Sequence, residues 1–457
     1  MQPSPRRYRD WVVDALNTDL PYDQFVRLQI AGDLIAADTG SIATGLFALG
    51  PKYNSDGNDP DGIAKAKGET LDDRMDTISR GLLALTVSCA RCHDHKFDPI
   101  PTLDYYSLAG VFNNTENTDP ETGLHALKDS GSADMPVALR GNLRKPGPVA
   151  PRRFLRILSG ADPPSFTQGS GRRELADAIA SPHNPLTARV IVNRVWQHHF
   201  GKALVRTPSN FGALGELPTH PLLLDWLAAE LVESGWSLKH LHRIIIGSAA
   251  YQMSSHRDEK SFQADGDNRL VWRMNLRRLD AESWRDTLLS VTVDLDEHLG
   301  GQPTEDILSR RRSLYLKVSR NGDKFATDEF LRLFDFPLMR ATVAKRPSSI
   351  VPQQYLFLMN SRFMTDRAQR LAQRLEALAD NDQDRIHQAY RLLYGRQPSP
   401  EEQEIGLAFL EGKSLSSNQQ PLDSNQDYAQ PDAERKMTPW QQYTQVLLSA
   451  NELMYVR

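Results

Sequence analysis

Long apolar runs, cysteine and any excess of charge are scarce in this sequence. No apolar segment approaches the roughly 18 residues that a transmembrane helix requires, so we do not expect the chain to span a membrane. Its 54 basic and 58 acidic residues give a net charge of -4. That balance lacks the basic footprint of a nucleic-acid-binding protein, so nucleic acid is not an expected partner.

A secretory signal is also missing from the start of the sequence. The short basic stretch Met1–Arg7 continues directly into Tyr8–Trp11, without the apolar core of a signal peptide. Apolar residues make up 40% and charged residues 25% of the 457 positions, as in ordinary globular proteins. This length is sufficient for two or three domains, each with its own core.

Only two cysteines occur, and both lie in one pentapeptide, CARCH. Cys89, Cys92 and His93 have the C-x-x-C-H spacing that attaches haem c, in which two thiols bond to the porphyrin and the histidine ligates the iron. By average residue usage the motif should arise by chance in on the order of one chain in several hundred of this length. The spacing therefore favours a haem site.

Three other interpretations of CARCH stay open: a zinc or other metal site, a disulfide, and unreactive thiols. A thioredoxin-like redox pair is disfavoured because no βαβ unit surrounds the motif. Zinc is less favoured because Cys89, Cys92, His93 and His95 are crowded into seven residues without a distant second ligand pair. An apolar helical pattern over residues 71–87 leads into the motif and is what covers a porphyrin face.

Helical periodicity dominates the rest of the chain and predicts a mainly α protein with a few short strands. Residues 1–114 are expected to form a cytochrome-like helical domain. Pro and Gly punctuate residues 115–172, which predicts a linker, and residues 173–457 are expected to form a larger helical domain. The polar segment 414–434 is predicted to be a mobile insertion. The clearest strand pattern covers residues 313–318.

A second group of histidines invites a metal hypothesis. His198 and His199 are adjacent, and His220, His240 and His242 follow within the next 43 residues. Adjacent residues on a helix point to different faces, so at most one of His198 and His199 can join a given site. Without carboxylate or cysteine companions at ligand spacing, hydrogen-bonded structural histidines are the favoured interpretation.

Long specific strings along the chain resemble those of large secreted proteins of planctomycete-type bacteria. These proteins combine a cytochrome-like domain with a second domain of unknown function. The strings in this chain are CARCHDHKFDPIP (89–101), NPLTARVIVNRVWQHHFG (184–201), TPSNFG (207–212), PTHP (218–221), VPQQYLFLMN (351–360) and SANE (449–452). The resemblance implies export, and it suggests that the present sequence is a fragment of a longer secreted precursor.

The preferred hypothesis is therefore a periplasmic or secreted c-type haem protein that transfers electrons or supports a larger redox system. Cys89 and Cys92 would be the thioether anchors and His93 the proximal ligand, with Met75, His125 and Met135 as candidate sixth ligands.

Two other functions stay open. One is a non-redox binding or scaffold protein that recognises an extracellular polymer or partner, in which CARCH either holds zinc or braces the fold. The other, a metal-dependent hydrolase, ranks lowest because no H-E-x-x-H or G-x-S-x-G string occurs. No reaction is assigned from the sequence.

Overall fold

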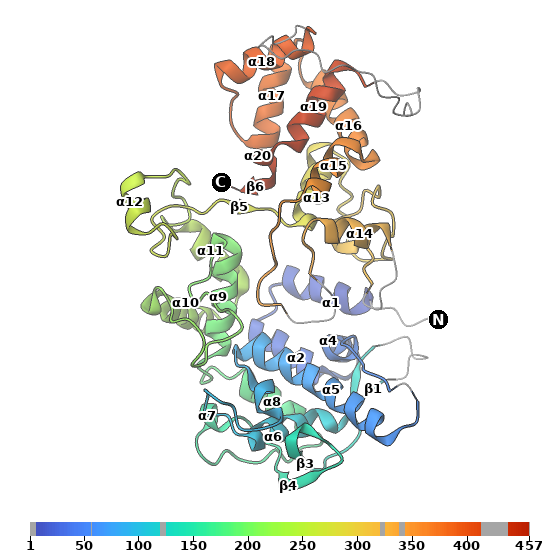
Figure 1. Cartoon of the computed structure of the whole chain (residues 1–457), viewed down its shortest axis with the longest axis vertical. Helices are drawn as coiled ribbons and strands as arrows, with labels where there is room; N and C mark the ends of the chain where they lie inside the picture. Colours follow the sequence, from blue (N-terminus) through green and yellow to red (C-terminus); the bar gives the residue numbers. More distant parts are fainter. Residues whose placement is uncertain are drawn as a thin grey trace. The chain divides into compact units, whose positions relative to one another are not determined.

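The computed structural model describes residues 6–55, 57–118, 125–319, 325–337, 343–412 and 437–456. Within these ranges the chain is mainly α-helical with a few short strands, which confirms the predicted fold class (Figure 1). It divides into two compact units, unit 1 (Met1–Asn275 with Arg340–Lys345) and unit 2 (Leu276–Met339 with Arg346–Arg457). In the described part, no helix is long and apolar enough to cross a membrane. The predicted insertion at 414–434 lies outside the described residues.

Unit 1 is built from helices and two small antiparallel hairpins, β1–β2 and β3–β4. Its elements are α1 (Arg6–Asn17), α2 (Tyr22–Ile35), α3 (Ala37–Ala43), α4 (Gly45–Ala48), α5 (Pro60–Ile78), α6 (Thr102–Asn113), β1 (Thr115–Asn117), β2 (Leu127–Asp129), β3 (Met135–Ala138), β4 (Pro146–Ala150), α7 (Arg156–Ser159), α8 (Arg172–Ile179), α9 (Thr187–Phe200), α10 (Pro221–Glu233), α11 (Leu238–Gly247) and α12 (Glu259–Ala264).

Unit 2 is a helical assembly closed by one two-residue strand pair, β5–β6. Its elements are β5 (Arg277–Arg278), α13 (Ala281–Val291), α14 (Ala326–Leu333), α15 (Pro352–Asn360), α16 (Arg362–Leu378), α17 (Asp382–Tyr394), α18 (Pro400–Leu410), α19 (Pro439–Ser449), α20 (Asn451–Met454) and β6 (Tyr455–Val456). A cluster of buried aromatic rings, including Trp284, Phe330 and Phe334, lies in its core.

The observed division differs from the predicted one, because the Pro- and Gly-rich segment 115–172 lies inside unit 1. This segment forms both hairpins and contributes buried side chains such as Leu127, Met135 and Leu155 to the main core. Helix α8, which follows it, packs against α2. Residues before and after the segment thus share one apolar core, and its Pro and Gly residues mark turns within a compact unit.

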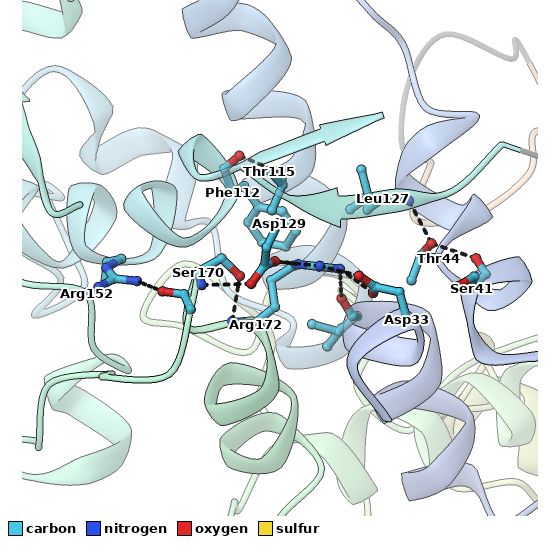
Figure 2. A network of polar contacts seen from close by, with 12 residues as sticks. Asp33, Ser41, Thr44, Phe112, Thr115, Leu127, Asp129, Arg152, Ser170 and Arg172 are labelled. Carbon is cyan, nitrogen blue, oxygen red and sulfur yellow. Dashed lines mark hydrogen bonds and ion pairs between the residues drawn. The ribbon is translucent and has the colours of Figure 1, made fainter. Parts of the chain in front are cut away.

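A buried ion network ties these distant parts of unit 1 together (Figure 2). Arg172, at the start of α8, is fully buried and donates to both carboxylate oxygens of Asp33 at 2.7 Å. It also donates to Asp129 at 2.6 Å and to the carbonyl of Ile30 at 3.2 Å. Burial would lower the pKa of Arg172, but the hydrogen bonds and charges of the two aspartates raise it above its ordinary value. The guanidinium therefore stays charged and joins three segments of the chain.

Helix starts follow the capping signals in the sequence. Before α18, the hydroxyl of Ser399 accepts from the backbone N–H of Glu402 at 3.2 Å, and the Glu402 carboxylate accepts from the N–H of Ser399 at 2.7 Å. This reciprocal pair is a capping box, the arrangement favoured by a Ser followed three residues later by Glu. Glu402 also pairs with Arg396 at 2.7 Å, and that hydrogen bond helps to lower the pKa of Glu402 to about 2.

The predicted strand at 313–318 is wrong. Ser313–Tyr315 forms a 3-10 turn, and only an isolated bridge joins Leu316 to Thr304. Burial does not follow the alternation either, because Leu314 is 43% exposed while both Tyr315 and Leu316 are buried. A strand also needs a partner segment along its length to accept its backbone hydrogen bonds.

Candidate functional site

The chain reaches CARCH through a break in the helix that precedes it. Helix α5 ends at Ile78 and continues as a π-helical turn, Ser79–Leu83, after which Ala84 adopts a left-handed conformation with φ 50°. A 3-10 helix, Val87–Arg91, then carries the first cysteine. Val87 and Ala90 are buried within this turn, so both thiols, Cys89 and Cys92, face outward and are free and exposed.

Tyrosine hydroxyls of α6 hold the CARCH turn in place. Tyr106 donates to the carbonyl of Arg91 at 2.9 Å, and it also lies 3.3 Å from the carbonyl of Ala138 at the end of β3. Burial raises the pKa of Tyr106 to about 12, so the hydroxyl keeps its proton and acts as a donor near neutral pH. Tyr105 donates to Asp72 of α5 at 2.9 Å, and Asp72 lies 3.6 Å from Arg91.

The loop between β3 and β4 covers one side of Cys92. Gly141 has φ 75°, and a Cβ atom at this position would lie 2.8 Å from the Cys92 sulfur. Because that separation is shorter than real carbon contacts allow, only glycine fits here without displacing the thiol. The backbone at Gly141 therefore lies close to the thiol of Cys92, a residue that is otherwise exposed.

His93 is exposed, and one of its ring nitrogens is already engaged. Its Nδ1 lies 2.7 Å from the backbone carbonyl of Asp94, which can only accept, so Nδ1 carries the proton. This tautomer leaves the Nε2 lone pair as the ligating position, as is usual for metal-binding histidines. The Asp94 carboxylate in turn accepts from the backbone N–H of Thr102 at 2.7 Å, where α6 begins.

His95 has a different role, because its side chain is turned inward and is only 4% exposed. Its Nδ1 accepts backbone N–H groups of Phe97 at 3.2 Å and Asp98 at 2.8 Å. Nε2 therefore carries the proton and faces the hydroxyl of Thr86 at 3.0 Å. With both ring nitrogens engaged, His95 braces the loop after CARCH.

Asp98 links this loop to a distant segment of unit 1. Its buried carboxylate accepts from the backbone N–H of Ala213 at 2.6 Å. The Cα of Gly212 packs so closely that a Cβ there would lie 2.5 Å from an Asp98 oxygen. Nearby, the N–H of Phe211 donates to the carbonyl of Ala84 at 2.7 Å. The segment 207–213 thus supports the loop that carries CARCH.

Gly212→Ala tests this support. We expect the variant to lower the free energy of unfolding by about 1–3 kcal/mol, because the buried, hydrogen-bonded Asp98 carboxylate has no room to withdraw. Gly81→Ala is the matched control, since no atom lies within 4 Å of a Cβ placed there. Urea denaturation of both variants measures the difference. Equal stability of the two would contradict the close contact.

The three candidate sixth ligands are less exposed than Cys89, Cys92 and His93. Met75 is fully buried in α5, and Met135, 5% exposed at the start of β3, packs against Gly110 of α6. His125 is half-buried just before β2. Cys89, Cys92 and His93, by contrast, are all exposed and follow one another along one short turn.

Tyr106, Asp98 and Gly141 are the supporting residues that sequence reasoning did not assign to the site. Asp98 precedes a proline, as turn-forming residues often do, and its bond to Ala213 has no local signal. A glycine in a Gly-Asn pair, such as Gly141, marks a turn but not its contact with Cys92. Tyr106 lies in a helix, and a helical pattern does not indicate which carbonyl its hydroxyl meets.

Two family models match the chain. Residues 171–410, more than half of the 457-residue chain, match PSD1, described as a protein of unknown function (DUF1553). The chain belongs to the PSD1 family. Residues 1–117 match PSCyt2, also described as a protein of unknown function (DUF1549). No curated protein and no solved structure matches this PSD1 protein. Two family models, one over the N-terminal part and one over the C-terminal part, confirm the predicted pairing of two domains and the unknown function of the second.

The two family matches do not coincide with the two compact units of this PSD1 protein. Unit 1 holds the PSCyt2 match and the first part of the PSD1 match, up to Asn275. Arg172 and Ala213 of the PSD1 match bond to Asp33 and Asp98 of the PSCyt2 match. Part of the PSD1 sequence is therefore built into the domain that presents CARCH.

Proposed function

We propose that this PSD1 protein is an exported c-type haem protein that transfers electrons within, or provides redox support to, a larger periplasmic or surface system. The observation that carries the proposal is the presentation of two free, exposed thiols and an exposed imidazole on one short turn. Cys89 and Cys92 would form the thioether bonds, and His93 would supply the proximal nitrogen through Nε2.

The residues of the turn fit the group in three respects. Both sulfur atoms are accessible, as covalent attachment requires. The hydrogen bond from His93 Nδ1–H to the Asp94 carbonyl fixes the ring orientation and increases the basicity of Nε2. Tyr106 donates a hydrogen bond to the Arg91 carbonyl and so holds the turn in place, which means that Cys89 and Cys92 would be positioned before haem binds. When bound, haem supplies a one-electron iron centre.

The same geometry gives less support to zinc at CARCH. A closed zinc site needs four converging ligands. His95, which would have to be one of them, is turned inward with both ring nitrogens engaged. In the described part of the chain, no three histidine, cysteine, aspartate or glutamate side chains come together as a metal-binding group. Haem c attachment needs only the two thiols and one imidazole from this segment.

The surface position of the turn also bears on the type of redox role. Because Met75 and Met135 are buried in the core of unit 1, their thioethers would need a rearrangement of that core to reach an iron at His93. We therefore propose that neither is the sixth ligand.

The exposed anchors favour exchange of electrons with a partner protein at the molecular surface. Attachment of haem c outside the cytoplasmic membrane makes the periplasm or cell exterior the proposed location.

Expression with an export signal and a cytochrome c maturation system tests the proposal. We expect a haem stain that persists on a denaturing gel and a c-type visible spectrum, because the bond to the protein is covalent. Metal analysis of the same sample distinguishes iron from zinc. Folded, exported protein without covalent haem would refute the proposal.

A further inference from the structure

A pair of histidines lies in unit 1 on elements that the haem proposal does not involve. His199, near the end of α9, and His242, in α11, bring their rings together with Nε2 of the first 2.7 Å from Nδ1 of the second. The ring centroids are 5.0 Å apart and the rings are tilted by 70°. Both residues are half-buried, so solvent reaches the pair.

The surrounding packing holds both rings in position. Tyr251 lies edge-on to the His199 ring at 5.5 Å, and the neighbouring Phe200 stacks on Trp196 at 4.0 Å. On α11, Leu241 is fully buried, which fixes the helix that carries His242. The approach of the two nitrogens is therefore set by helix packing and not by two free surface side chains.

The other histidines of this region do not join the pair. His240 is bonded to Glu230 at 2.8 Å, and Nδ1 of His220 lies 3.0 Å from the hydroxyl of Thr219. His198 is exposed on another side of α9. As expected, only one of the adjacent histidines 198 and 199 takes part.

We propose that His199 and His242 form a two-imidazole binding site for a divalent transition-metal cation such as Cu²⁺, Ni²⁺ or Zn²⁺. Imidazole nitrogens bind such ions at about 2.0–2.1 Å, so two neighbouring ligands with bond angles of 90–109° lie about 2.9–3.3 Å apart. The observed separation of 2.7 Å is a few tenths of an ångström shorter, so the two rings must move slightly apart and turn until both lone pairs point at the ion. Imidazole suits Zn, Cu and Ni better than Ca or Mg.

Binding moves one proton within the pair. In the neutral pair one nitrogen donates its N–H to the lone pair of the other. When the ion enters, the donor ring takes its other tautomer, with its single N–H on the outer nitrogen. The two facing nitrogens then each offer a lone pair to the metal, and no proton is released overall. Within the described residues no third histidine, cysteine or carboxylate completes the set, so water fills the remaining coordination positions.

Copper titration of the full-length chain tests this inference independently of the haem proposal. Cys89→Ser and Cys92→Ser are included in every sample, because thiolates also attract soft metals. We expect one Cu²⁺ per chain, with nitrogen hyperfine structure from two imidazoles in its electron paramagnetic resonance spectrum. His199→Gln and His242→Gln should each weaken binding at least about tenfold, the smallest loss expected even for an outer-shell partner.

His198→Gln is the matched control, since it removes a neighbouring exposed imidazole from the same helix. Glutamine keeps a hydrogen-bonding amide in the half-buried position, and circular dichroism checks that each variant is folded. If one variant fails to fold, the other tests the site by itself. Unchanged Cu²⁺ affinity in a folded His199 or His242 variant, or a wild-type spectrum without two nitrogen ligands, would overturn the proposal.

Discussion

Replacement of both Cys89 and Cys92 by serine is expected to remove all covalently bound haem and leave the protein folded. The two thiols are the only ones in the chain, so no other residue can form a thioether bond. Both are exposed, and substitutions at such positions usually change stability by no more than about 0.5 kcal/mol. A haem stain on a denaturing gel measures the loss, and thermal unfolding measures the stability.

Single variants and methionine variants sharpen this result. Cys89→Ser or Cys92→Ser alone should retain haem through one thioether, with a visible spectrum shifted from that of the two-bond form. Met75→Leu and Met135→Leu should leave the spectrum of the wild-type haem protein unchanged, because both side chains are buried in the core. Covalent haem in the double cysteine variant would refute the assignment of Cys89 and Cys92 as anchors. A change in the visible spectrum of Met75→Leu would refute the proposal that the Met75 sulfur is not an iron ligand.

Arg172→Met is expected to lower the free energy of unfolding of unit 1 by about 3 kcal/mol. The change removes the guanidinium that neutralises Asp33 and Asp129, and removal of one partner from a buried ion pair leaves uncompensated charge. We expect the low end of the usual 3–5 kcal/mol range, because Asp33 and Asp129 side chains are 12% and 23% exposed and keep some contact with water. Urea denaturation at neutral pH measures the loss.

Arg173→Met is the matched control for this prediction. Arg173 is adjacent in sequence and exposed, so its loss should change stability by less than about 0.5 kcal/mol. Because Arg172 bonds to Asp33 across 139 residues, the Arg172→Met variant should also weaken the packing of α8 against α2. Equal stability of the two variants would show that the network contributes little.

Local signals in the sequence were sufficient for the helices and their caps. Apolar residues such as Trp11 and Phe25 recur at helical spacing in α1 and α2, and Ser399 and Glu402 form the capping box at the start of α18. These signals succeed because helix hydrogen bonds and caps join residues no more than about four positions apart. The strand at 313–318 failed for the converse reason, since its partner had to come from elsewhere in the chain.

The sequence by itself determined the mainly α fold class, the family pairing and the CARCH turn as the chemically distinctive segment. Only the tertiary structure decided that Asp98 bonds to Ala213 across 115 residues, that His95 is turned inward, and that His199 meets His242. The bond of Asp98 and the meeting of the two histidines depend on which distant segments pack together, and periodicity carries no information about that choice. Because distant segments pack together in this way, the predicted N-terminal domain and the first part of the predicted C-terminal domain share one core.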